Sequence, residues 1–218
     1  QDLLQIARLA HEVIKVGREV SGRKDIRCTV SIGGFVPKPH TPFQWAAQLD
    51  HETTDSRLHK LRDAIRADRQ FGKSIGLRYH DGKPGIVEGL LSRGDRRVGA
   101  VIEQVWRDGA RFDGWSEHFS FDRWMQAAET ALADLPVDVD WYTTRERELA
   151  EVLPWDHLDS GLDKDWLWED WQDALAEVPV EDCRWTPCFD CGVCDQMGTE
   201  IQVGPTGVTL LGMRSEEH

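Results

Sequence analysis

The first 80 residues predict an α/β fold, because helix-like and strand-like apolar patterns alternate along them. Apolar residues recur at helical spacing over residues 2–20, and residues 26–32 then alternate apolar and polar side chains as a strand does. A second helical pattern over residues 51–70 and a second alternating segment over residues 74–80 follow. Short units in the order helix, strand, helix, strand are typical of a parallel sheet.

Beyond residue 80 the pattern is helical up to residue 135, and an acidic region rich in tryptophan follows. Residues 1–130 carry 21 Lys/Arg and 18 Asp/Glu, whereas residues 131–218 carry 5 and 21. We therefore expect three parts, over residues 1–80, 81–135 and 136–218. The last ends in an expected hairpin or tail near residues 201–211. The excess of negative charge in the acidic half argues against direct nucleic-acid binding there, because it repels phosphates.

Composition and leader signals bound the surroundings of the chain. Of its 218 residues 40% are hydrophobic and 30% charged, which is sufficient for a core. No run approaches the length of about 18 apolar residues that spans a membrane, so no membrane partner is expected. Clustered cysteines and the absence of an apolar leader predict a reducing, cytoplasmic location. The chain begins at Gln1 without a Met, and we interpret it as a piece of a longer protein.

The densest chemical signal is a group of four cysteines within twelve residues. They are Cys183, Cys188, Cys191 and Cys194, at spacings x4, x2 and x2. Thiolates brought together by one loop bind a metal ion or an iron–sulfur cluster. The continuous C-x2-C-x2-C run favours a [4Fe–4S] cluster, since structural zinc usually takes two separated C-x2-C arms. Zinc stays open as the alternative, because the usual fourth cysteine after such a run is absent, and so does a disulfide pair or a set of free thiols.

A stiff loop follows the first predicted strand. Three prolines keep it extended and remove backbone donors: Pro37, Pro39 and Pro42. In a parallel α/β barrel, ligands bind at the carboxyl ends of the strands, which is where this loop begins. A plain rigid connection, with Phe43 and Trp45 as packing anchors, is the alternative interpretation.

Two other groups of polar residues and the fifth cysteine have simpler interpretations. His80 beside Asp81, at the end of the second predicted strand, would be a catalytic pair or merely a hydrogen-bonded turn. Four arginines near residue 100 could reach phosphates or an acidic partner, but charges on a helix surface are the simpler interpretation: Arg93, Arg96, Arg97 and Arg107. Cys28 lies on the apolar side of the first strand, and we interpret it as a small packed residue.

Residues 30–45, with the sequence VSIGGFVPKPHTPFQW, resemble the last strand and following loop of a radical S-adenosylmethionine (SAM) barrel. The family is that of radical SAM proteins fused to a B12-binding domain. Three later runs are similar to the same family: Glu88–Arg97, Leu153–Gly161 and Cys188–Cys194. The resemblance therefore covers nearly the whole chain.

The resemblance implies that the chain is the C-terminal part of a partial TIM barrel, followed by a mostly helical, Cys/Trp-rich extension. Proteins of this family have an N-terminal cobalamin-binding domain and a C-x3-C-x2-C motif, whose [4Fe–4S] cluster cleaves SAM to a 5′-deoxyadenosyl radical. That motif is absent here, so the resemblance puts the catalytic cluster in the missing N-terminal part of the same protein. It assigns no catalytic residue to this chain and makes the cysteine loop an accessory site.

By the same resemblance, Phe35, Val36 and Pro37 lie near the adenine of SAM, while His40 and Gln44 face the substrate. The expected function is that of a radical SAM enzyme with [4Fe–4S], SAM and cobalamin as cofactors. Methyl or methylthio transfer is the inferred reaction type, and no substrate is implied.

Two further expectations complete this interpretation. The alternative function is a non-enzymatic binding module, stapled by zinc, that recruits a protein partner. The isolated chain is expected to be inactive in SAM cleavage. It is also expected to expose the apolar faces of residues 3–16 and 26–32, which would lower its solubility.

Overall fold

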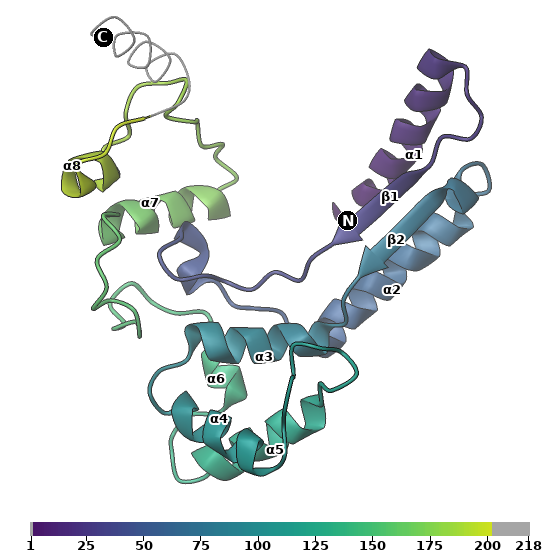
Figure 1. The fold of residues 1–218 in the computed structure, drawn as a ribbon. Helices are drawn as coiled ribbons and strands as arrows, with labels where there is room; N and C mark the ends of the chain where they lie inside the picture. Colours follow the sequence, from purple (N-terminus) through teal and green to yellow (C-terminus); the bar gives the residue numbers. More distant parts are fainter. Residues whose placement is uncertain (1, 202–218) are drawn as a thin grey trace, which may run out of the picture. The chain divides into compact units, whose positions relative to one another are not determined.

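A computed structural model describes residues 2–201 of the chain (Figure 1). The described residues form two compact units. The first, called here the sheet unit, comprises residues 2–36 and 47–145. The second, called the tryptophan unit, comprises residues 37–46 and 146–201. These boundaries differ from those expected at residues 80 and 135, because the helices that follow residue 80 pack with those before it.

The sheet unit contains a two-stranded parallel sheet, which confirms the α/β prediction. Strand β1 (Cys28–Ile32) pairs with β2 (Ile75–Tyr79), with Cys28 opposite Ile75. Helices α1 (Asp2–Ser21) and α2 (His51–Ala67) pack with the strands (Figure 1). Their shared core consists of Ala10, Ile14, Leu61, Ile65, Phe71 and Ile75. Two strands do not by themselves make a barrel, so the partial TIM barrel stays a prediction.

Side-chain caps explain where α2 begins and why it ends earlier than residue 70. The Asp50 carboxylate accepts a hydrogen bond from the Thr53 backbone N–H at 2.7 Å, which satisfies a free donor of the first turn. The Asp68 carboxylate accepts from the backbone N–H groups of Gln70 and Phe71, at 2.9 and 3.0 Å. Such bonds favour a turn over a further helical turn, so the chain leaves the helix after Ala67.

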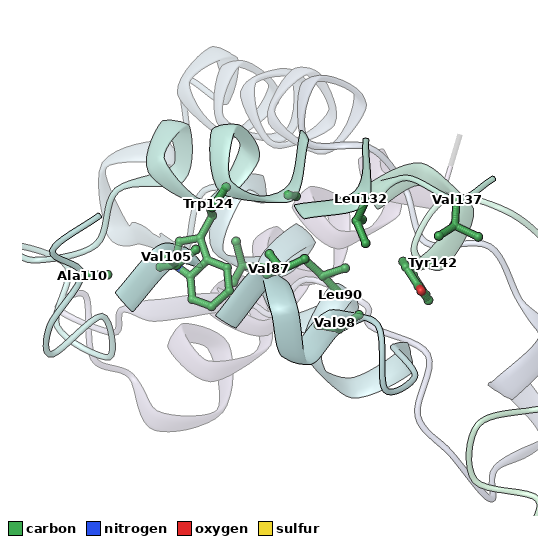
Figure 2. Close-up of a cluster of buried hydrophobic side chains, with 12 residues drawn as sticks. Val87, Leu90, Val98, Val105, Ala110, Trp124, Leu132, Val137 and Tyr142 are labelled. Atoms are coloured by element: carbon green, nitrogen blue, oxygen red, sulfur yellow. The ribbon is translucent and has the colours of Figure 1, made fainter. Parts of the chain in front are cut away.

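Four helices complete the sheet unit: α3 (Gly82–Arg93), α4 (Val98–Arg107), α5 (Phe121–Leu132) and α6 (Val139–Tyr142). Their buried side chains form a separate core, in which Trp124, Leu90 and Tyr142 are prominent (Figure 2). Ser120 and Asp138 cap the starts of α5 and α6.

Arg93, at the end of α3, was expected to be a charge on a helix surface, and the structure shows that this was wrong. Arg93 is fully buried, and its Nη1 donates a hydrogen bond of 2.8 Å to the Thr143 carbonyl oxygen. This carbonyl follows α6 and also accepts from the Gln48 backbone N–H at 3.0 Å. A buried carbonyl needs such donors, so Arg93 stabilises a chain crossing and does not face a phosphate.

Asp95 is expected to make the stability of the sheet unit depend on acid pH. Its carboxylate accepts from Arg97 Nε at 3.0 Å and from the Tyr142 hydroxyl at 3.0 Å. Chiefly through the Arg97 bonds, its pKa falls from 3.8 to about 2, while burial and then Asp95 raise the pKa of Tyr142 to about 12. A lowered carboxyl pKa stabilises the fold above about pH 4, and this contribution is lost as pH falls towards 2.

Asp95→Asn should therefore cost about 2 kcal/mol in urea unfolding at neutral pH and much less at pH 2. Asp25→Asn is the matched control, since Asp25 pairs with Arg23 on the surface at 2.7 Å. An exposed pair of this kind contributes little. Equal losses in the two variants would contradict the role given to Asp95.

Helix α1 exposes apolar side chains, as expected for residues 3–16. Leu4, Leu9, Val13 and Val16 are all exposed, and Leu9 retains 66% of its surface. The consequence for solubility stays a prediction. Among residues 2–201, no helix is both long enough and apolar enough to cross a membrane.

The tryptophan unit is built around aromatic side chains from two distant segments. It contains the short 3-10 helix η1 (Pro42–Trp45), α7 (Lys164–Leu175) and α8 (Val193–Met197). Its core consists of Trp45, Ala46, Leu153, Trp155, Leu167 and Trp171. The Phe43 ring contacts Trp171 edge-on at a centroid distance of 5.4 Å. Residues 202–211, most of the expected terminal hairpin, lie outside the described residues.

Candidate functional site

The proline-rich loop after β1 folds onto a segment more than 100 residues away in the sequence. The Gln44 side-chain oxygen accepts hydrogen bonds from the His40 backbone N–H at 3.1 Å and from Trp155 Nε1 at 2.7 Å. His40 has a left-handed backbone with φ of 54°, which is uncommon for a residue other than glycine. Buried Gln44 thus holds both the loop and the Trp155 indole in place.

The two predicted substrate residues, His40 and Gln44, line one cavity of about 360 Å³. The run after Trp155 also lines this cavity: Asp156, His157, Leu158, Asp159 and Ser160. The structure therefore brings together two of the stretches that carry the family resemblance. The volume is at the low end for ligand pockets, so the cavity suits a small polar molecule or one part of a larger one.

Two carboxylates of this cavity are already engaged by the protein. Asp156 Oδ2 accepts from Lys164 Nζ at 2.7 Å and from the Leu153 backbone N–H at 2.9 Å. Asp159 Oδ1 accepts from the Gly161 backbone N–H at 2.8 Å. Within residues 2–201, the buried Ser160 hydroxyl oxygen has no hydrogen-bond partner.

Two imidazoles and a hydroxyl are therefore the groups of this cavity best placed to bind a polar ligand. Sequence reasoning missed Asp156, His157, Asp159 and Ser160 as site residues. The signal that could have found them is the density of hydrogen-bonding side chains in this turn.

The three residues predicted to lie near adenine differ in exposure. Phe35 retains 53% of its surface, whereas Val36 and Pro37 are buried. Phe35 is therefore the only one of the three with an exposed side chain, and any approach to Val36 and Pro37 would use their backbone. The structure holds no test of SAM binding, so this assignment stays a prediction.

The cysteine loop has tight turns and is bonded to its own unit. The Asp190 backbone N–H donates to Cys188 Sγ at 3.4 Å, and Asp190 and Gly192 have left-handed φ of 53° and 92°. The Asp163 backbone N–H donates to the Cys191 carbonyl oxygen at 3.0 Å. A Cβ added to Gly192 would lie 2.9 Å from the Gly161 carbonyl oxygen, so this close approach requires glycine.

The donors of the loop suit a soft metal or an iron–sulfur cluster, although they are not arranged for one. All four cysteines are free thiols. Burial, followed by the charges of Cys188, Cys191 and Cys183, raises the pKa of the Cys194 thiol. No group of three or more His, Cys, Asp or Glu side chains among residues 2–201 is arranged to hold a metal ion. Binding would require the loop to close further.

No protein-family model, curated protein or solved structure matches this chain. Its function must therefore be argued from the residues of the two units.

Proposed function

We propose that the chain is the C-terminal part of a radical SAM enzyme of the B12-fused family. The observation that best supports this proposal is the set of chain segments that make up the tryptophan unit. Of the four runs that resemble that family, residues 37–45 of the run 30–45 and the whole of residues 153–161 and 188–194 belong to this one unit. The Gln44–Trp155 bond joins the first two stretches, and the Asp163–Cys191 bond joins the third to the helix that follows the second. Independent motifs that fold together are more readily explained by one shared function.

In this proposal the parallel pair of β1 and β2, with α1 and α2, forms the last part of a partial TIM barrel. SAM, bound at an iron–sulfur cluster upstream of this chain, would supply a 5′-deoxyadenosyl radical. Phe35 would cover the adenine, and the buried backbone at Val36 and Pro37 would hold the approach to it rigid.

The cavity beside His40 and Gln44 would hold a polar part of the substrate. His40, His157 and Ser160 offer donors and acceptors there. The Gln44 oxygen is engaged by His40 and Trp155, so its expected role is to position the loop. The substrate is not specified by these groups, and methyl or methylthio transfer is the proposed reaction type.

Formation of 5′-deoxyadenosine tests this function. The complete protein, including the part upstream of Gln1, should produce it from SAM under anaerobic reduction, whereas the 218-residue chain alone should produce none. The reason is that the chain lacks a C-x3-C-x2-C motif. Product from the chain alone, or an upstream part without that motif, would refute the proposal.

A zinc-stapled binding module is the second candidate. It is favoured by the bonds that tie the cysteine loop to Asp163 of its own unit, since a structural zinc joins such segments. This candidate predicts zinc in equal amount to the protein, no iron, and no upstream cluster motif.

A further inference from the structure

A larger cavity in the sheet unit has no part in the proposed function. Its volume is about 1150 Å³, and it begins at His80 and Asp81, immediately after β2. Ligands of parallel α/β sheets bind beyond the carboxyl ends of the strands, which is the position of these two residues. Apolar side chains form much of the wall: Val87, Leu91, Phe119, Phe121 and Trp124.

Two buried polar atoms of this wall have no hydrogen-bond partner among the described residues. They are Asp113 Oδ1 and Ser92 Oγ. The other carboxylate oxygen of Asp113 accepts from Trp124 Nε1 at 2.8 Å. Trp124 is itself part of the helical core (Figure 2). Its indole N–H therefore fixes the direction of the carboxylate. A buried acceptor without a partner is costly, so a ligand that donates a hydrogen bond here is favoured.

The charged side chains that line the cavity favour a ligand with a positive charge. Asp81, Glu88, Asp113 and Asp122 contribute four carboxylates, and Lys83 is the only lysine or arginine among the described lining residues. Lys83 Nζ lies 5.3 Å from the centre of the Phe121 ring. The field inside a concave acidic site attracts cations.

The lining of this cavity suits an organic cation better than a metal ion. Among residues 2–201, no three acidic, histidine or cysteine side chains are arranged to hold a metal. The apolar wall would instead contact a hydrocarbon or aromatic body, as in most small-molecule pockets.

We propose that this cavity binds an organic ammonium ion, with its charged head at Asp113 and Ser92 and its apolar body against Leu91 and Phe119. Neither SAM nor the cysteine loop is required for this binding. The inference therefore stands or falls independently of the proposed radical SAM function.

Titration of the 218-residue chain with phenethylammonium tests the proposal. The indole N–H resonance of Trp124, assigned with Trp124→Phe, should shift saturably, because its acceptor is the carboxylate that meets the ligand. The anion 3-phenylpropionate, which has the same phenethyl body, and the neutral 2-phenylethanol should cause no comparable shift. Absence of a saturable shift with phenethylammonium, or equal shifts with all three compounds, would overturn the proposal.

Asp113→Asn is the decisive variant, since an amide oxygen can still accept from Trp124 while the charge and the free acceptor disappear. It should weaken phenethylammonium binding by about tenfold or more. Glu117→Gln removes an equal charge from an exposed position of the same loop and should leave the affinity unchanged. Equal weakening by the two variants would show a general charge effect and refute the site.

Ser92→Ala supplies a second test that does not depend on Asp113. It removes a buried hydroxyl that has no partner among residues 2–201, so the fold should tolerate it. The dissociation constant for phenethylammonium should rise about threefold or more. Unchanged affinity in both Ser92→Ala and Asp113→Asn would exclude the proposed position of the ammonium head.

Discussion

Replacing Trp45 by alanine is expected to destabilise the tryptophan unit by about 3–5 kcal/mol. Trp45 is completely buried, and its ring meets Trp168 edge-on at a centroid distance of 5.0 Å. Its backbone carbonyl accepts from the Arg147 N–H at 2.9 Å, so the side chain lies at the junction of the two segments of the unit. A loss of this size is a large part of the stability of an ordinary domain. Urea unfolding and limited proteolysis between residues 146 and 201 would measure it.

Two further variants separate cavity formation from a general effect of losing a tryptophan. Trp185→Ala should change stability by less than about 0.5 kcal/mol, because this side chain retains 66% of its surface. Trp45→Phe should cost less than Trp45→Ala, since it fills most of the space. It also removes the Trp45 indole N–H, which is buried without a partner among the described residues. If Trp45→Ala and Trp185→Ala lost equal stability, Trp45 would not be the centre of this core.

Local patterns were sufficient to predict the two strands of the sheet unit. The alternation in residues 26–32 and 74–80 predicted β1 and β2, and the structure confirms both with slightly shorter bounds. Such patterns succeed because each strand buries one side against α1 and α2. The early end of α2 depended on the Asp68 side chain, which a periodic pattern does not include.

Contacts between distant segments could not be predicted from local patterns. Gln44 and Trp155 are 111 residues apart, and their hydrogen bond helps define the smaller cavity. His40 and Gln44 were assigned from a resemblance, while His157 and Ser160 were not assigned to a site. The sequence contains all of these side chains, but their meeting depends on how η1 packs with the residues before α7.

Burial of charge was a second limit on prediction. Arg93 is a charged residue that the sequence pattern places on the surface, yet it is buried and donates a hydrogen bond to the Thr143 carbonyl after α6. Asp113 is likewise an ordinary loop residue in sequence, and only its bond to buried Trp124 directs it to the larger cavity. For charged residues, the pattern predicts exposure unless the distant partner is known.

The proposal that the cysteine loop binds a metal or a cluster predicts its largest effect for Cys191→Ser, which should lose that metal. The four thiols lie within twelve residues of the sequence, and Cys191 is held through its backbone carbonyl by Asp163. A serine there removes a sulfur ligand while it leaves that backbone bond possible. Removal of an outer partner of a metal site lowers affinity about 10–100-fold, and loss of a ligand should exceed this. Anaerobic reconstitution, followed by iron, sulfide and zinc analysis and by the absorption spectrum, would measure it.

Cys28→Ser is the matched control, because Cys28 is the one cysteine outside residues 183–194. It packs beside the core of the sheet unit, so its loss should leave the metal content unchanged. A [4Fe–4S] cluster in the wild-type chain that is absent in Cys191→Ser and present in Cys28→Ser would support the accessory-cluster proposal. Stoichiometric zinc that is lost in Cys191→Ser and kept in Cys28→Ser would instead favour a structural zinc site, because the Asp163–Cys191 bond already joins the loop to its unit. Equal metal content in all three proteins would show that the loop is not the binding site.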